Sequence, residues 1–350
     1  MNRFQKYLLD EFVEEYQENR ISRREALKLI ASITGSLVLA NSILAACAPL
    51  DEESAAVQPA DASPTTGEPA SATSTAIPAL PTASPQPAAE ATASPPPADT
   101  PTSLPEGAAQ DSPAHGTVTA DDPMVNASAV EFPGEDATLQ GYLSRPAGGE
   151  PAPVILVCHE NRGLTGHTQD VTRRLAKAGY VALAVDLLSR QGGSASLSSS
   201  EVPGILSSIA PEVFVQDFTS GWRWLQGESF AQAERVGMMG FCFGGGVTWS
   251  MATQMPALKA AVPFYGPHPE ISEVPNIQVA VLAIYGERDT RINQGIPVIE
   301  EAMQQNSKIY TKIIYPDSDH AFFNDTGTRY NPTAAQDAWS QALAWFQKYV

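Results

Sequence analysis

The seven residues from Gly240 to Gly246 constrain the fold more than any other stretch of this chain. They read Gly-Phe-Cys-Phe-Gly-Gly-Gly, follow an apolar run at 236–239 and precede a helix-like segment at 247–252. A sharp turn from strand to helix brings two backbones close together and therefore needs glycines at the points of contact. Such a turn presents its central side chain, here Cys242, as a nucleophile. The alternative from this string alone is a buried structural cysteine, because cysteine often packs as a small apolar residue.

Apolar runs alternate with helical patterns from about residue 125 onward. Several of these runs are continuous, which is typical of strands buried on both faces of a parallel sheet. Expected strands lie at 129–133, 138–143, 153–158, 181–186, 235–239, 258–265, 278–285 and 310–315, and expected helices at 168–178, 213–225 and 333–349. The alternation predicts an α/β domain, mainly parallel, with helices on both faces of the sheet. The active site of such a sheet lies at the carboxyl ends of its strands.

Two later strand ends carry possible partners for Cys242. Asp289 follows one apolar strand in the string Gly-Glu-Arg-Asp, and His320 follows the next strand. The order nucleophile, acid, base is that of α/β-hydrolases. Asp289 would accept a hydrogen bond from one ring nitrogen of His320, and the other nitrogen would face the thiol. Each residue taken singly could be an ordinary surface residue, but three strand ends in this order predict a catalytic triad and the α/β-hydrolase fold.

The domain at 120–350 resembles the dienelactone hydrolase family in five short motifs. These are His-Glu-Asn-Arg-Gly-Leu at 159–164, Asp-Leu-Leu-Ser-Arg-Gln at 186–191, Gly-Phe-Cys-Phe-Gly-Gly at 240–245, Gly-Glu-Arg-Asp at 286–289 and His-Ala-Phe at 320–322. The resemblance implies a hydrolase that cleaves small carboxylic esters or lactones through an acyl-cysteine intermediate, without a cofactor. It covers most of residues 125–350.

The resemblance also assigns roles around the nucleophile. It implies that Glu160 contacts the resting thiol and exchanges a proton with it when substrate arrives; the alternative is a loop ion pair with Arg162. A glutamate beside a buried thiol would disfavour a permanent thiolate, which is open to oxidation. The oxyanion hole is expected from two backbone N–H groups, those of Phe243 and Asn161.

The substrate-binding residues match the family less completely. Arg190 matches an arginine that holds the substrate carboxylate, a task suited to a planar guanidinium. Tyr265 matches pocket tyrosines, although it could equally belong to the core. The family's second arginine, four positions after the catalytic histidine, is replaced here by Asn324, and Arg329 is not at the matching position. A less acidic ester, or one with its anion elsewhere, is therefore expected.

Residues 1–47 resemble a twin-arginine export signal that ends in a lipobox. Arg23 and Arg24 precede an apolar run at 29–46, which ends in Leu-Ala-Ala-Cys at Cys47; the usual phenylalanine of the motif is Ala26. The resemblance implies cleavage before Cys47, lipidation of its thiol and a membrane-anchored protein on the extracytoplasmic side. The alternative is an uncleaved membrane anchor.

Two further segments, at 1–21 and 48–116, have distinct sequence patterns. Apolar residues at helical spacing among acidic ones predict a short amphipathic helix within residues 1–21, to which no function is assigned. Residues 48–116 are rich in Pro, Ala, Ser and Thr and are almost free of aromatics. Such a segment cannot bury enough apolar surface to fold, so a disordered stalk is expected.

Composition narrows the possible partners. A formal net charge of -18 argues against nucleic acid. Three cysteines make no disulfide framework, and His159 and His167 lack an obvious third ligand, so no metal site is expected. Related thioesterase, peptidase or dehalogenase chemistry on the same triad, or a tethered non-catalytic binding module, stay as alternatives.

Overall fold

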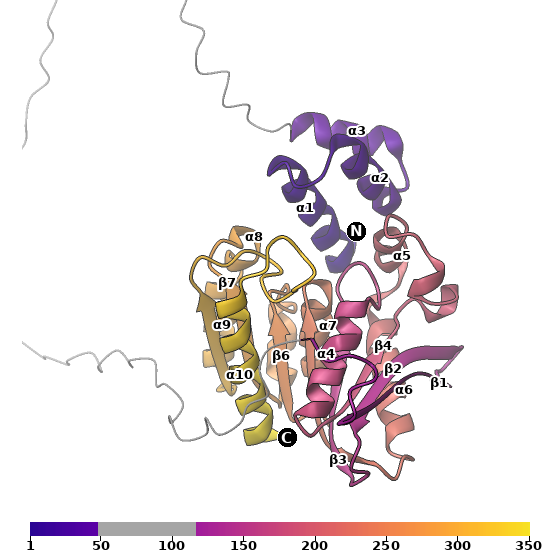
Figure 1. Ribbon diagram of the computed structural model, residues 1–350. Coiled ribbons are helices and arrows are strands. Elements are labelled where there is room, and N and C mark those ends of the chain that lie inside the picture. Colours follow the sequence, from indigo (N-terminus) through magenta and orange to yellow (C-terminus); the bar gives the residue numbers. More distant parts are fainter. Residues whose placement is uncertain (48–116) are drawn as a thin grey trace, which may run out of the picture. The chain divides into compact units, whose positions relative to one another are not determined.

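An eight-stranded sheet forms the centre of the computed structural model, which describes residues 1–47 and 117–350 (Figure 1). The strands are β1 (Val125–Pro133), β2 (Thr138–Pro146), β3 (Ala152–Cys158), β4 (Val181–Val185), β5 (Ala231–Phe241), β6 (Ala260–Phe264), β7 (Ala280–Gly286) and β8 (Tyr310–Tyr315). Their spatial order is β1-β2-β4-β3-β5-β6-β7-β8. The predicted stalk, residues 48–116, lies outside the described residues.

The pairing of the strands is antiparallel at one edge and parallel elsewhere. β1 and β2 form a hairpin in which Val125 lies opposite Pro146, and β2 also pairs antiparallel with β4. All pairs from β4 through β3, β5, β6 and β7 to β8 are parallel. The carboxyl ends of β5, β7 and β8 therefore meet at one edge of the sheet.

The central strands are buried on both faces, as their continuous apolar sequences predict. Every residue of β4, β6 and β7 is buried. Both faces are consequently covered by helices, as expected for a parallel sheet. These findings confirm the predicted fold class, an α/β-hydrolase fold with a mainly parallel sheet.

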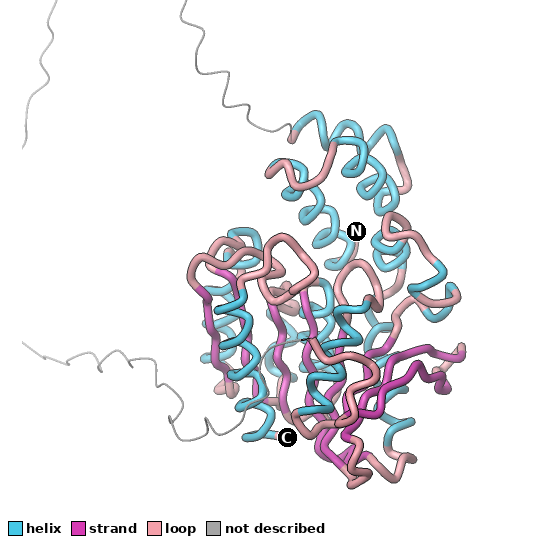
Figure 2. Tube along the Cα trace, in the orientation of Figure 1, coloured by secondary structure: helices cyan, strands magenta, loops and turns pink. Residues whose placement is uncertain are grey.

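The helices of this domain follow the strands in sequence. They are α4 (Gly166–Lys177), α5 (Val202–Ser208), α6 (Pro211–Leu225), α7 (Phe243–Gln254), α8 (Thr290–Asn293), α9 (Ile296–Gln305) and α10 (Pro332–Tyr349). α4 and α10 lie in front of the strands in the view of Figure 1, and Figure 2 separates helices, strands and loops by colour. Two short 3₁₀ turns, Ser189–Gln191 and Ser194–Ser196, lie between β4 and α5.

Residues 1–47 form three further helices, α1 (Arg3–Gln17), α2 (Arg23–Thr34) and α3 (Leu37–Ala46). They belong to the same compact unit as the hydrolase domain. α1 and α2 contact α5, and α1 also contacts α7. Among the described residues, none of the helices combines the length and the apolar character required to cross a bilayer.

α1 confirms the predicted amphipathic helix and shows where its apolar face goes. Asn2 caps its N-terminus by accepting a hydrogen bond from the backbone N–H of Gln5. Phe4, Leu8 and Phe12 are fully buried in the main core of the hydrolase domain. Burial of each such side chain contributes about 1.5–3 kcal/mol, so α1 is integrated into the domain.

Candidate active site

Cys242 lies in a strained turn between β5 and α7. Its backbone angles are φ 59° and ψ -120°, a left-handed conformation that non-glycine residues rarely adopt. The turn is fixed by its own hydrogen bonds: the N–H of Cys242 donates to the carbonyl of Phe264, and its carbonyl accepts from Gly245. The thiol is only 3% exposed.

The glycines of this turn allow close backbone contacts, as the sequence predicts. A Cβ on Gly240 would lie 2.3 Å from the carbonyl oxygen of Gly244. A Cβ on Gly244 would lie 2.5 Å from the carbonyl oxygen of His159. A side chain on Gly240 would therefore push α7 away from β5, and one on Gly244 would push the turn away from the end of β3.

Asp289 and His320 meet at the same sheet edge. His320 Nδ1 lies 2.5 Å from Asp289 Oδ2, and both side chains are buried. Burial opposes ionisation of Asp289, but His320 outweighs it and lowers the pKa of that carboxyl. Asp289 also caps α8 by accepting from the backbone N–H of Ile292. The acid and base of the predicted triad are therefore adjacent, on strand ends that follow β7 and β8.

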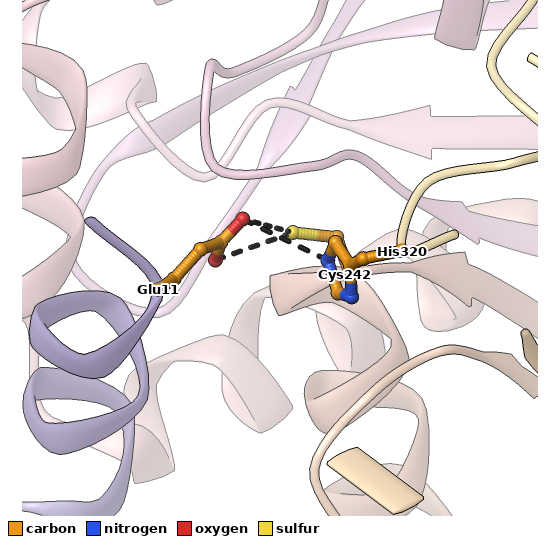
Figure 3. A group of neighbouring side chains, drawn as sticks. All are labelled: Glu11, Cys242 and His320. Carbon is orange, nitrogen blue, oxygen red and sulfur yellow. Dashed lines mark hydrogen bonds and ion pairs between the residues drawn. The ribbon is translucent and has the colours of Figure 1, made fainter. Parts of the chain in front are cut away.

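Helix α1 inserts two polar side chains between the nucleophile and the base. The Tyr7 hydroxyl lies 3.2 Å from Cys242 Sγ and 3.3 Å from His320 Nε2. The Glu11 carboxylate lies 3.4 Å and 3.6 Å from Sγ through its two oxygens, and 3.7 Å from Nε2 (Figure 3). Both side chains are buried. No sequence motif indicates either position, because the amphipathic pattern of residues 1–21 does not identify the surface that it covers.

The thiol is held in its neutral form. Burial raises the pKa of Cys242, and the negative charges of Glu11 and then Glu160 raise it further. Hydrogen bonds to the sulfur from the Tyr7 hydroxyl and then from the backbone N–H of Phe243 lower the pKa of Cys242, but they do not reverse the rise. A neutral thiol can donate to Glu11 while it accepts from Tyr7, which fits the contacts observed.

Glu11 itself remains ionised although it is buried. Burial opposes its charge, but His320, Arg291 and Arg329 together lower its pKa. The same two arginines pair with the next turn of α1. Arg291 Nε lies 2.8 Å from Glu14, and an Arg329 nitrogen lies 3.3 Å from Glu15. Arg291 also stacks over the Tyr7 ring, with its guanidinium carbon 4.7 Å from the centroid.

Glu160 lies near the nucleophile but contacts other residues. Its Oε2 accepts a hydrogen bond of 2.6 Å from Asn324 Nδ2. Among the described residues, no hydrogen bond joins Glu160 to the thiol; Glu11 occupies that place. Arg162 does not pair with Glu160 but donates to the carbonyl of Ser199. The predicted proton exchange between Glu160 and Cys242 stays a prediction.

Tyr265 and Asn161 are both buried beside the site. The Tyr265 ring lies 5.1 Å from the His320 ring, and its backbone has φ 37°. Burial, followed by the charge of Glu160, raises the pKa of the Tyr265 hydroxyl. Asn161 is 6% exposed, in the loop after β3, and Phe243 begins α7. Both positions are compatible with the expected oxyanion hole, whose donors stay a prediction.

Arg190 is engaged elsewhere. Its guanidinium bonds both oxygens of Asp217, at 2.8 Å and 2.9 Å, and it also bonds Asp136. Hydrogen bonds to Asp217 and then to Asp136 raise the pKa of Arg190, and the opposing effect of burial is smaller. Sequence position could not reveal these partners, because they come from the hairpin β1–β2 and from α6. Binding of a substrate carboxylate by Arg190 stays a prediction.

Two groups of side chains near the site carry donor atoms that can bind a metal ion. His159 contacts the carbonyl of Glu160 and accepts from Leu187, and His167 pairs with Asp325. Glu11, Cys242 and His320 place donor atoms within 4.8 Å of one another, and sulfur, imidazole and carboxylate can hold Zn²⁺. In this structure hydrogen bonds to Tyr7 and to each other engage those atoms. Cys47, at the end of α3, is a free thiol like Cys158 and Cys242.

Comparisons with known proteins agree with this geometry. Residues 139–350 match the model of the dienelactone hydrolase family. A candidate carboxymethylenebutenolidase from Methylorubrum extorquens is 34% identical over 259 residues, which cover 69% of this chain and 88% of the relative. A protein of the same description from Escherichia coli is 31% identical over 258 residues, 68% of this chain and 93% of the relative.

A solved structure supports the same assignment. The crystal structure of a candidate dienelactone hydrolase from Klebsiella pneumoniae has a TM-score of 0.61 and 29% sequence identity. It covers 64% of this chain and 99% of that protein. The chain therefore belongs to the dienelactone hydrolase family and is a hydrolase with the α/β-hydrolase fold.

Proposed function

We propose that this protein hydrolyses small carboxylic esters or lactones through an acyl-cysteine intermediate. The observation that carries the proposal is the buried Asp289–His320 pair at the strand ends beside the Cys242 turn. That arrangement fixes the histidine tautomer and leaves its Nε2 directed toward the nucleophile side of the site. Family membership supports the same reaction class.

The proposed reaction has two stages. His320 takes the proton of Cys242, and the sulfur attacks the substrate carbonyl carbon while the carbonyl electron pair moves to oxygen. Backbone N–H groups of Phe243 and Asn161 would stabilise that oxyanion. Collapse breaks the ester C–O bond, and His320 returns the proton to the leaving oxygen. Water then gives a proton to His320 and attacks the acyl carbon. Collapse breaks the C–S bond, and His320 returns the proton to the sulfur as the acid leaves.

The specificity for a carboxylate-bearing substrate is not carried by the positions expected from the family. Asn324 bonds Glu160, and Arg190 bonds two aspartates. Asn324 carries no charge, and the guanidinium of Arg190 is paired with carboxylates in this structure. We therefore base the proposal on the ester or lactone bond rather than on the acid group of the family substrate.

An acyl-trapping experiment tests the proposal. The full chain is incubated with p-nitrophenyl acetate and with a panel of lactones, thioesters and haloacids, and intact mass is recorded during turnover. We expect an acetyl adduct that maps to Cys242, with turnover lost on Cys242→Ala by about 10³-fold or more. Unchanged turnover in Cys242→Ala would refute the mechanism. Preference for thioesters or haloacids would instead support the related chemistries.

We further propose that the protein is exported and anchored by lipid at Cys47. The twin-arginine-like pair and the lipobox support this, as does the exposure of Leu37, Val38 and Leu39 on α3. Metabolic labelling with a fatty acid analogue, compared between the parent chain and Cys47→Ser, tests it. Equal labelling of both, or labelling of neither, would contradict the lipid anchor.

A further inference from the structure

We propose that helix α1 is an autoinhibitory plug, which occupies the active site of the full-length chain and must leave before an ester can react. This inference rests on the proposed ester or lactone hydrolysis. It assigns a role to α1, which the sequence pattern predicted as an amphipathic helix without a function.

The first argument is occupancy of the reaction centre. A substrate carbonyl has to lie against Cys242 Sγ, and the proton must pass between Sγ and His320 Nε2. Tyr7 and Glu11 fill this space. The Tyr7 hydroxyl lies 3.2 Å from the sulfur, and a Glu11 carboxylate oxygen lies 3.4 Å from it (Figure 3). No acyl group can reach the sulfur while these side chains remain.

The second argument is chemical. A carboxylate beside the sulfur repels the thiolate, and the Tyr7 hydroxyl at 3.3 Å from Nε2 engages the base. The nucleophile is therefore both covered and kept protonated.

The third argument is that the domain is shaped to receive this helix. Phe4 packs against the rings of Phe214 and Phe243, at 5.4 Å and 5.0 Å between centroids. Gly246, in the first turn of α7, leaves room for it: a Cβ there would lie 3.0 Å from the Phe4 ring. Gly204 of α5 similarly admits Ser32 of α2, whose Cβ would be 2.6 Å from an added Cβ.

The fourth argument is charge complementarity along the helix. Glu14 and Glu15 pair with Arg291 and Arg329. Arg291 lies in α8, which Asp289 caps, and Arg329 lies in the segment that follows His320. Beyond the helix, Arg20 pairs with Asp319, the residue before His320. The acidic pattern of α1 therefore matches basic groups placed around the triad.

The boundary of the helical segment suggests how the plug is removed. α3, the last of the three helices, ends at Ala46, and the cleavage implied by the lipobox resemblance falls between Ala46 and Cys47. One cut there would release all three helices together. Inhibition of the uncut chain and activation by export would then share a single step.

The test displaces α1 in the full chain and reads the thiol directly. Leu8→Asp places a carboxylate on the buried face of α1 and leaves Tyr7 and Glu11 themselves unchanged. Gln17→Asp adds the same charge at an exposed position of the same helix and is the matched control. Two rates are measured for each protein: modification of Cys242 by iodoacetamide, mapped by peptide mass, and hydrolysis of p-nitrophenyl acetate.

We expect Leu8→Asp to raise both rates at least about tenfold over the parent and Gln17→Asp, equivalent to about 1.4 kcal/mol of lost docking. Equal modification rates in all three proteins would overturn the plug. Faster modification with slower hydrolysis would also overturn it, since α1 would then serve catalysis. Faster modification with no hydrolysis in any protein would sustain the plug and refute the ester-hydrolase function.

A second variant keeps the proposal testable if Leu8→Asp fails to fold. Glu14→Arg with Glu15→Arg places like charges against Arg291 and Arg329 without altering the apolar face of α1. The same rise in both rates is expected, and it should shrink in 1 M NaCl, where such repulsion is screened. Rates equal to those of the parent would count against the proposal.

Discussion

At the scale of single residues, the carboxylate that faces the thiol of Cys242 comes from helix α1. The sequence motif points to Glu160, which bonds Asn324, whereas Glu11 lies 3.4 Å from Cys242 Sγ. The proximity of Cys242, Asp289 and His320 could be predicted because each follows a recognisable strand. Glu11 could not, since 231 residues separate it from Cys242 and a helical pattern does not name its target.

Replacement of Glu11 by glutamine should make the thiol more acidic. The negative charge of Glu11 raises the pKa of Cys242, so a neutral amide at that position lowers it and increases the thiolate fraction at a given pH. Each 1.4 kcal/mol of repulsion removed raises that fraction about tenfold. The pH dependence of iodoacetamide modification measures the change, and its midpoint should move to lower pH.

Glu14→Gln is the matched control for this substitution. It removes one negative charge from the same helix and weakens the contact with Arg291, but Glu14 does not contact the thiol. Its midpoint should stay closer to that of the parent. If both substitutions moved the midpoint equally, general loosening of α1 would explain the effect, and the direct contact with Glu11 would not.

At the scale of elements, long apolar and helical patterns were predictable and short or mixed ones were not. β4, β6 and β7 are continuous buried runs and match expectation. α5 was missed because its seven residues include Pro203 and Gly204, which weaken any helical signal. Its role depends on packing, since Gly204 is where α2 approaches most closely.

The turn between β5 and α7 gives a prediction about stability. Gly244→Ala would bring a Cβ within 2.6 Å of the carbonyl oxygens of His159 and Cys158. Overpacking against backbone costs about 1–3 kcal/mol, so the free energy of unfolding should fall by that amount. Gly148→Ala, where an added Cβ meets nothing within 4 Å, should change it by less than about 0.5 kcal/mol.

Urea unfolding followed by circular dichroism compares the two variants. Activity adds a second measurement, because a displaced turn also moves Cys242 relative to His320. A Gly244→Ala protein as stable as Gly148→Ala would show that the turn can relax away from β3, and the predicted close contact would not limit this fold.

At the scale of the whole molecule, residues 1–47 and 117–350 belong to one compact unit while the chain between them connects the two parts. Connection makes docking of α1 an intramolecular event, which is favoured over association of separate chains. The sequence predicted an export segment and a catalytic domain as separate functions. It could not predict that the first covers the second, since that depends on complementary shape and charge across distant segments.

Cutting the connection should make inhibition depend on concentration. With a protease site inserted within residues 48–116, the uncut protein should keep the same specific activity at every dilution. After cutting, the helices can dissociate, so specific activity should rise as the sample is diluted toward nanomolar concentration. Dissociation of the N-terminal fragment on size exclusion, without any gain in activity, would contradict a plug.

The pairing of Arg291 and Arg329 with Glu14 and Glu15 has a consequence for the field around the opened site. While α1 is docked, its two glutamates neutralise these two guanidiniums. When α1 leaves, both guanidiniums lose their glutamate partners, on a chain whose formal net charge is -18. A positively charged entrance to the active site, on an otherwise acidic surface, attracts anions over about 8 Å at physiological salt. Anionic esters would then be captured faster than neutral ones, and rising ionic strength would erase the difference.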